Sequence, residues 1–214
     1  MEQPVDSSRP AILLEACVDS VESAIRAEQH GADRIELCTN LHLDGTTPDR
    51  SLIAAVVSAV QIPVKVMIRP RAGDFVYDAT EFSLMLDAIR QCRSLGIPAI
   101  ATGILNPDNT LDITRLKTLA TAAYPMEVTF HKCIDLVPDI FEAIYQLKAI
   151  PEITHILTSG QAATAWEGRA LLKQLLKACG HDLGLIAAGR ITQENLQELI
   201  NATGAVSFHG KRIV

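Results

Sequence analysis

Apolar runs of strand length alternate with amphipathic, helix-like segments along almost the whole chain. The runs follow one another at intervals of roughly 20–35 residues, which is the spacing of repeated strand–helix units. The eight expected strands cover residues 11–17, 33–38, 63–69, 97–102, 125–131, 153–158, 183–188 and 205–209. Eight such units in one domain predict a closed (β/α)8 barrel of the TIM type. An open doubly wound sheet is the alternative, and the absence of a glycine-rich dinucleotide motif after the first run disfavours it.

The composition supplies the aliphatic core that such a barrel needs. The 214-residue chain is 48% hydrophobic but only 4% aromatic, so Ala, Ile, Leu and Val must fill the space between the helices and a buried parallel sheet. A net charge of −6 and the lack of a basic run argue against a nucleic-acid partner and against an anionic membrane surface. We expect a disordered or loosely packed extension over residues 1–10 and a single domain over residues 11–214.

Neither a signal peptide nor a membrane span is expected from the sequence. The first ten residues are polar and carry two prolines, and no apolar run approaches the length of a membrane span. The five cysteines are an odd number without paired spacing. We therefore expect free thiols in a cytoplasmic protein.

Little sequence follows the eighth expected strand. Five residues come after His209, too few for a complete helix at ~1.5 Å of rise per residue. We expect the eighth helix to be incomplete and the outer face of the barrel to be apolar at that point. An apolar face favours self-association, so we expect a homo-oligomer, a dimer or a tetramer, with its interface near the gap.

One short pattern ends both the first and the second expected strand: Leu-Leu-Glu-Ala-Cys at 13–17 and Arg-Ile-Glu-Leu-Cys at 34–38. Side chains alternate between the two faces of a strand, so Glu15 shares a face with Cys17, and Glu36 with Cys38. Adjacent strands then place two carboxylates and two thiols on one surface. In a (β/α)8 barrel the active site lies at the carboxyl ends of the strands, which makes this surface a candidate site.

Polar residues end most of the other expected strands as well, and unpaired burial of such groups is costly. The candidates for acid–base chemistry are Glu15, Glu36, Asp74 and His131. The candidates for binding a small anion are Arg69, Arg71, Lys132, Thr158, Ser159, Gly160, Gly189 and His209. In this second set, Gly160 and Gly189 are expected to open helices whose backbone N–H groups face the ligand.

Each candidate also has a purely structural interpretation. Glu15 and Glu36 can pair with Lys65 or Arg69 inside the barrel, and His131 can orient a loop rather than transfer protons. The two cysteines of the repeated pattern can be ordinary core residues, because free Cys is often buried. The residue pattern alone leaves these alternatives open.

Seven blocks of sequence, taken in order, are similar to those of one known family. The blocks are Arg-Ile-Glu-Leu-Cys at 34–38, Gly-Thr-Thr-Pro at 45–48, Met-Ile-Arg-Pro-Arg-Ala-Gly-Asp-Phe-Val-Tyr at 67–77, Thr-Gly-Ile-Leu at 102–105, Thr-Phe-His-Lys at 129–132, Ile-Leu-Thr-Ser-Gly at 156–160 and Phe-His at 208–209. Together they resemble the CutC family, often labelled copper homeostasis proteins, over residues 12–209. The resemblance implies a (β/α)8 barrel, a cytosolic location and self-association. The chain departs from the family pattern at Lys132, where an arginine is common, and Lys lacks bidentate geometry.

Two functions follow as hypotheses. The resemblance suggests copper binding, and Cu(I) prefers thiolate and thioether ligands. Cys17 and Cys38 would lie on neighbouring strands about 4.8 Å apart, with Met67 as a further soft ligand. The alternative is an enzyme that acts on a small carboxylate or phosphate at the rim of the barrel. It accounts for the arginines, which copper does not need, but it names no substrate.

Overall fold

The structure, a computed structural model, describes residues 11–214, and the expected N-terminal extension lies outside them. Eight parallel strands close into a barrel in sequence order, with the last strand pairing back onto the first. The strands are β1 (Leu13–Val18), β2 (Arg34–Leu37), β3 (Val64–Ile68), β4 (Ala99–Thr102), β5 (Glu127–Phe130), β6 (Ile153–Thr158), β7 (Gly184–Ala187) and β8 (Ser207–Gly210). The predicted closed (β/α)8 barrel is confirmed.

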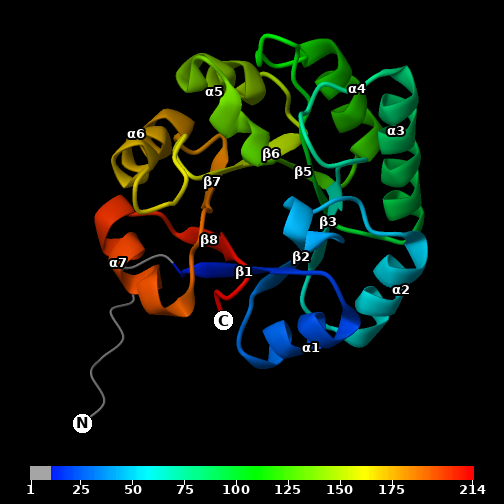
Figure 1. Ribbon diagram of the computed structural model, residues 1–214, viewed down its shortest axis with the longest axis horizontal. Helices are drawn as coiled ribbons and strands as arrows, with labels where there is room; N and C mark the ends of the chain where they lie inside the picture. Colours follow the sequence, from blue (N-terminus) through cyan, green and yellow to red (C-terminus); the bar gives the residue numbers. More distant parts are fainter. Residues whose placement is uncertain (1–10) are drawn as a thin grey trace.

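Seven α-helices surround the strands in the part of the chain that the structure describes (Figure 1). They are α1 (Val21–Gln29), α2 (Arg50–Ala59), α3 (Ala79–Ser94), α4 (Ile113–Ala123), α5 (Ile140–Lys148), α6 (Arg169–Cys179) and α7 (Gln193–Thr203). Two short 3-10 helices, η1 (Leu41–Leu43) and η2 (Lys132–Leu136), lie in the loops after β2 and β5. The expectation that Gly160 and Gly189 open helices is wrong, because α6 and α7 begin several residues later.

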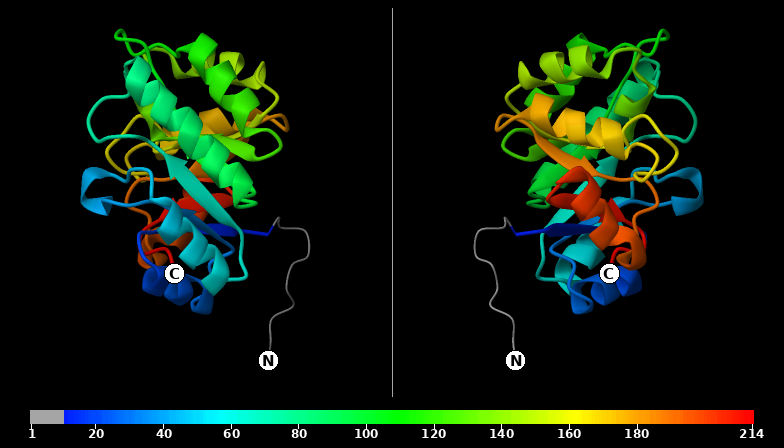
Figure 2. Two further views of the ribbon diagram at one scale, coloured as in Figure 1. Left: turned by 90° about the vertical axis from the view of Figure 1, so that its right-hand side faces the viewer. Right: turned by 90° about the vertical axis from the view of Figure 1, so that its left-hand side faces the viewer.

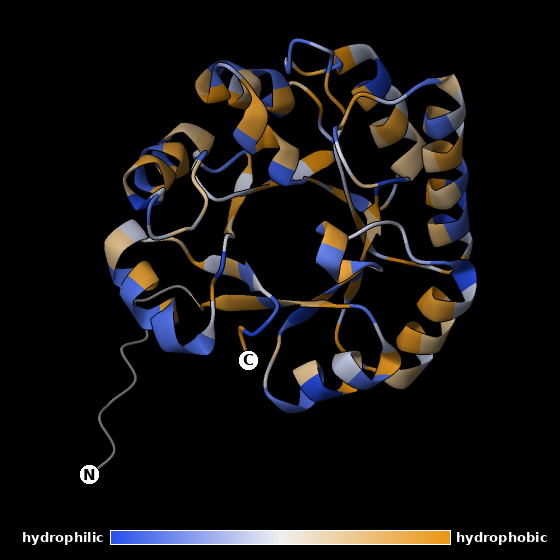
Figure 3. Cartoon of the chain, in the orientation of Figure 1, coloured by the Kyte–Doolittle hydropathy of each residue, from blue (hydrophilic) through white to orange (hydrophobic). Residues whose placement is uncertain are grey.

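Short acidic side chains fix where several helices begin. The Asp78 carboxylate accepts the backbone N–H of Glu81, and the Glu81 carboxylate accepts the backbone N–H of Asp78, which forms a capping box before α3. The Asp49 and Asp112 side chains cap α2 and α4 by accepting the backbone N–H of Leu52 and of Arg115. The apolar residues of the helices gather on the sides that face the barrel (Figure 3). No helix of residues 11–214 has the length and apolar content that crossing a membrane requires.

The sector between α7 and α1 holds the C-terminal residues instead of an eighth helix (Figure 1). Arg212 forms a parallel bridge with Thr192, at the start of α7, and the Ile213 side chain is buried. Phe208, which points outward from β8, is fully buried. The expected incomplete eighth helix is therefore confirmed, but the outer face of β8 is covered within this chain.

The strand register sorts the inward-pointing side chains into layers to which alternate strands contribute. The layer at the middle of the barrel holds Glu15 of β1 and Lys65 of β3. The next layer toward the carboxyl ends holds Glu36 of β2 and His209 of β8. Barrels of this type usually fill these layers with bulky branched apolar side chains. Here the layers carry a network of charged groups instead.

Candidate functional site

Glu15 is fully buried, and three basic side chains converge on its carboxylate. The Lys65 Nζ lies 2.7 Å from Oε2, the His209 Nδ1 lies 2.9 Å from Oε1, and the Arg34 guanidinium pairs with Oε2. Burial alone would raise the pKa of Glu15, but the charges of Lys65, His209 and Arg34 hold it well below its usual range. Glu15 is thus an ionised group that neutralises the inside of the barrel.

Glu36 is a second buried carboxylate with a different environment. Its Oε2 lies 3.6 Å from the His209 Nε2 and 3.8 Å from the Cys17 Sγ, while its Oε1 has no hydrogen-bond partner. Burial raises the pKa of Glu36, with the charge of His209 opposing and the charge of Glu15 adding to the effect. Burial would lower the pKa of His209, but Glu36 and Glu15 raise it above its usual value. Glu36 and His209 therefore compete for a proton beside the Cys17 thiol.

The thiols of Cys17 and Cys38 lie 3.6 Å apart at the mouth of the barrel, by which we mean the carboxyl ends of its strands. The two residues pack with Met67 and Ala101 in a small apolar cluster of their own. The hydrogen bond with Cys38 raises the pKa of the Cys17 thiol, and burial and the charge of Glu36 raise it further. Cys17, Glu36 and His209 also each place one ligand atom within 4.8 Å of the others, so they lie within reach of a single metal ion.

Arg69 is a buried cation that joins two loops at the mouth. Its Nη1 donates to the carbonyls of Leu43 and Gly45, both at 2.9 Å, and its Nη2 donates to the carbonyl of Gly73 at 3.1 Å. Its Nε has no hydrogen-bond partner. None of the ion pairs within residues 11–214 includes Arg69. This guanidinium is therefore compensated by carbonyl dipoles and by the Phe75 ring, 4.9 Å away, rather than by a carboxylate of residues 11–214.

Arg71 and Asp74 pair with each other in the loop after β3. The Arg71 Nη2 lies 2.8 Å from the Asp74 Oδ1 and also donates to the carbonyl of Val76, and the Nε pairs with Glu81. The Asp74 side chain is 68% exposed. The structure thus uses both residues to shape this loop and places Asp74 apart from the buried carboxylates.

Asp135, in η2, accepts the donors that the loop after β6 was expected to offer to an anion. Its carboxylate accepts the hydroxyl and the backbone N–H of Ser159 at 2.8 and 2.9 Å, the hydroxyl of Thr158 at 2.5 Å and the N–H of Gln161 at 2.9 Å. The Lys132 Nζ lies 3.3 Å from the same carboxylate. A carboxylate of the chain itself therefore occupies this set of donors.

The two glycines expected near this anion site have packing roles. The backbone N–H of Gly160 donates to the Thr158 hydroxyl at 2.9 Å. Gly189 has a φ of +106°, and a Cβ there would come within 2.8 Å of the Ser159 Cβ. Glycine at this position allows the loops after β6 and β7 to pack closely.

His131 is buried at the end of β5. Its Nδ1 accepts the backbone N–H of Cys133 at 3.3 Å, and its Nε2 has no partner. Burial lowers the pKa of His131 to about 3, and the charge of Arg69 contributes. A Cβ at Gly103 would lie 2.6 Å from the imidazole, so the ring fills the space that this glycine leaves.

Several residues of the network were missed by the sequence reasoning. Arg34 pairs directly with Glu15, and His155 of β6 lies close enough to Lys65 and Arg34 that their charges, after burial, lower its pKa to about 4. Both residues could have been found from the sequence, because each is a charged or titratable residue at an inward-facing position of an otherwise apolar strand. Asp135 gave no such signal, because its partners lie 23 to 26 residues away along the chain.

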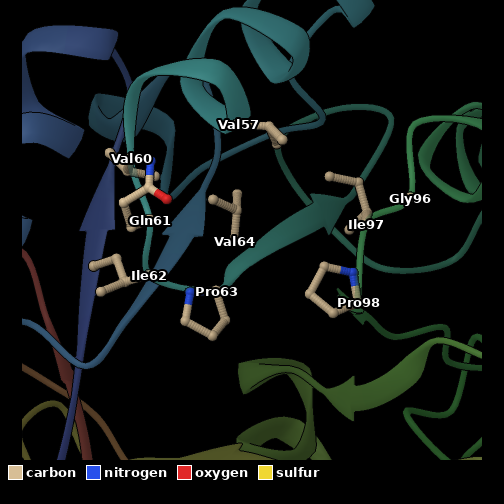
Figure 4. Close-up of a pocket in the computed structure, with 9 residues that line it drawn as sticks. All are labelled: Val57, Val60, Gln61, Ile62, Pro63, Val64, Gly96, Ile97 and Pro98. Carbon is tan, nitrogen blue, oxygen red and sulfur yellow. The ribbon is translucent and has the colours of Figure 1, made fainter.

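A shallow hollow lies at the opposite ends of the strands, where the chain enters β3 and β4 (Figure 4). Its lining residues are Val57, Val60, Gln61, Ile62, Pro63, Val64, Gly96, Ile97 and Pro98. None of them is titratable. The chemistry of this barrel is therefore concentrated in its interior and at its mouth.

Comparison with known proteins agrees with this geometry. The CutC family model matches residues 12–214. The chain belongs to the CutC family. The human copper homeostasis protein cutC homolog is 41% identical over 197 residues, which cover 92% of this chain and 72% of that protein. A CutC family protein of Chromobacterium violaceum is 39% identical, with 92% of this chain and 79% of that protein covered.

Solved structures place this CutC-family chain in the same fold. A CutC crystal structure from Streptococcus agalactiae superposes with a TM-score of 0.91 at 32% identity, covering 95% of this chain and all of that one. A phosphonomutase structure from Burkholderia cenocepacia reaches a TM-score of 0.66 at 15% identity, with 94% of this chain and 87% of that one covered. Similarity at this lower level shows the shared barrel alone.

Proposed function

We propose that this CutC-family chain binds Cu(I) through Cys17 and Cys38 and takes part in copper homeostasis. The observation that carries the proposal is the 3.6 Å separation of the two Sγ atoms. Metal–thiolate bonds are about 2.3 Å long, so two sulfurs at this distance can share one ion with little movement. Met67 packs against the same pair and offers a thioether, which Cu(I) also accepts.

Proton release accompanies binding in this proposal. A thiol must lose its proton to become a metal ligand, and the Cys17 pKa lies well above its usual range. Glu36 and His209 lie next to this thiol and are suited to accept the proton. We therefore expect the affinity for Cu(I) to increase as the pH rises.

The test is a Cys17→Ala/Cys38→Ala double variant, with Cys92→Ala/Cys179→Ala as the matched control. The control cysteines are equally buried, but they lie on α3 and α6, away from the mouth. Cu(I) stoichiometry is measured under anaerobic, reducing conditions by competition with a chromogenic Cu(I) chelator. We expect one tightly bound Cu(I) per chain in the wild type and the control, and none in the double variant. Tight binding that survives in the double variant would rule out this site.

The alternative, a rim enzyme that uses the full predicted set of anion-binding residues, has less support. Arg71 and Lys132 are ion-paired within the chain, and Asp135 already occupies the donors around Ser159.

We also propose that the protein self-associates and acts in the cytoplasm. The support for both proposals is the family resemblance. The apolar outer face that was expected to favour self-association is covered within the chain at β8.

A further inference from the structure

We infer that Arg69, Tyr77 and His131 form a binding site for the carboxylate group of a small molecule at the mouth of the barrel. Each carries a buried polar atom that has no hydrogen-bond partner among the other residues of 11–214: the Arg69 Nε, the Tyr77 hydroxyl and the His131 Nε2. The three residues are 5%, 3% and 3% exposed. Buried donors without acceptors are rare in folded proteins. Three of them at the end of a barrel where ligands bind indicate a missing acceptor.

Contacts around Phe75 bring the three residues into one neighbourhood. The Arg69 guanidinium lies 4.9 Å from the centre of the Phe75 ring, and the His131 ring lies 5.1 Å from the same ring. Tyr77 follows Phe75 by two residues. Burial raises the pKa of Tyr77, and Arg69 opposes this through its charge and through hydrogen bonding to the Tyr77 side chain. Burial lowers the pKa of His131, and the charge of Arg69 adds to this effect. Arg69 directly follows β3, Tyr77 lies later in the same loop, and His131 directly follows β5.

The loop between β3 and α3 is held in place before any ligand arrives. The carbonyl of Phe75 accepts the backbone N–H of Leu105 at 3.0 Å, and the carbonyl of Tyr77 accepts the Arg115 guanidinium at 2.6 Å. The Arg71 side chain crosses this loop and stacks 5.3 Å from the Tyr77 ring. η1, whose last residue accepts a hydrogen bond from Arg69, projects from one end of the barrel (Figure 2). The site is therefore preorganised, which favours binding.

Hydrogen bonding fixes His131 as a donor at this site. Its Nδ1 accepts the Cys133 N–H, so the proton of the neutral ring is assigned to Nε2. The Arg69 Nε is always a donor, and the Tyr77 hydroxyl donates readily. Each of the three groups therefore has a hydrogen that it can donate to an acceptor.

The charge at the site favours a carboxylate over other acceptors. Arg69 supplies one positive charge that pairs with no carboxylate of residues 11–214, and His131 is neutral at neutral pH because burial lowers its pKa. One buried positive charge matches a monoanion, whereas a phosphate dianion would leave an uncompensated negative charge. A carboxylate also offers about four acceptor positions for three donors.

This inference does not rest on copper binding. The thiols lie on β1 and just after β2, whereas the three donors lie in the loop after β3 and just after β5. A failure of one proposal therefore leaves the other intact. Variants of Cys17 and Cys38 and variants of Tyr77 separate the two.

The test uses Tyr77→Phe, which removes one donor and leaves the ring in place. Acetate and formate are titrated as probes by isothermal calorimetry, with inorganic phosphate and chloride at matched ionic strength. We expect saturable binding of the monocarboxylates to the wild type and a dissociation constant about tenfold higher in Tyr77→Phe. Tyr145→Phe is the matched control, because Tyr145 is 74% exposed on α5, and it should bind like the wild type.

Proton-detected NMR of 15N-histidine-labelled protein gives a second readout. Acetate should shift the Nε2–H resonance of His131 in the wild type and equally in Cys17→Ala/Cys38→Ala. The inference is overturned by an absence of saturable binding, by Tyr77→Phe binding like the wild type, or by phosphate binding more tightly than acetate and formate.

Discussion

At the scale of single residues, Glu15 determines the charge balance of the barrel interior. One fully buried carboxylate faces Lys65, Arg34 and His209, and Lys65 and Arg34 have no other carboxylate partner among residues 11–214. Removing one partner of a buried ion pair costs far more than the pair contributes, since the remaining charge is left unpaired. Glu15, the glutamate of the first Glu-x-Cys pattern, therefore contributes to stability through its ion pairs.

We therefore expect Glu15→Gln to lower the free energy of unfolding by about 3–5 kcal/mol. The loss is measured by urea denaturation followed by circular dichroism. Glu198→Gln, on the exposed face of α7, is the control and should change stability by less than about 0.5 kcal/mol. Adding Lys65→Met to Glu15→Gln should recover part of the loss. A Glu15→Gln protein as stable as the wild type would contradict this account.

At the scale of elements, η2 and the loop after β6 hold each other through Asp135. Four donors of that loop point at one carboxylate, so the loop conformation depends on a residue of another strand–helix unit. An amide at this position retains one carbonyl acceptor and brings two N–H groups into a site made of donors.

Asp135→Asn should open the loop after β6 locally. We expect amide hydrogen exchange at Ser159 and Gln161 to accelerate at least tenfold, which corresponds to about 1.4 kcal/mol of local stability. Asp108→Asn is the control, because Asp108 accepts from the backbone and hydroxyl of Thr110 within its own loop. The Asp108→Asn control should leave amide hydrogen exchange in the loop after β6 unchanged. Unchanged protection at Ser159 in Asp135→Asn would show that the loop is held by other contacts.

The contrast between Glu15 and Asp135 shows how far the sequence predicts this protein. The spacing of apolar runs predicted all eight strands. The alternation of side chains between the two faces of a strand placed Glu15 on the same face as Cys17, and Glu36 on the same face as Cys38. Whether a donor is free depends on tertiary partners, which a single sequence does not reveal. Arg71 pairs with Asp74 in its own loop and with Glu81 of α3, while the Arg69 Nε pairs with no carboxylate, although the two arginines are separated only by Pro70.

At the scale of the whole molecule, the interior couples folding to pH. Burial is the main cause that lowers the pKa of His131 to about 3 and of His155 to about 4, so both are neutral in the native barrel. In the unfolded chain the pKa of both histidines is about 6.5. As the pH falls below 6.5, the unfolded chain binds protons that the native state does not bind, so stability decreases. Glu36, whose pKa is raised by burial, opposes this trend as the pH falls through its native pKa, whereas Glu15, whose pKa is lowered by its basic partners, adds to it at lower pH.

We expect the free energy of unfolding to fall by about 1–2 kcal/mol for each of these two histidines between pH 7 and pH 5. His209 does not contribute to this decrease, because its pKa is raised and its stabilisation is complete below pH 6.5. Urea denaturation at pH 7, 6 and 5 measures the slope. His155→Gln should flatten the slope, since it removes one neutral buried imidazole, whereas His181→Gln, at an exposed position, should leave it unchanged. Equal slopes in His155→Gln and the wild type would show that the barrel interior admits protons more readily than its burial implies.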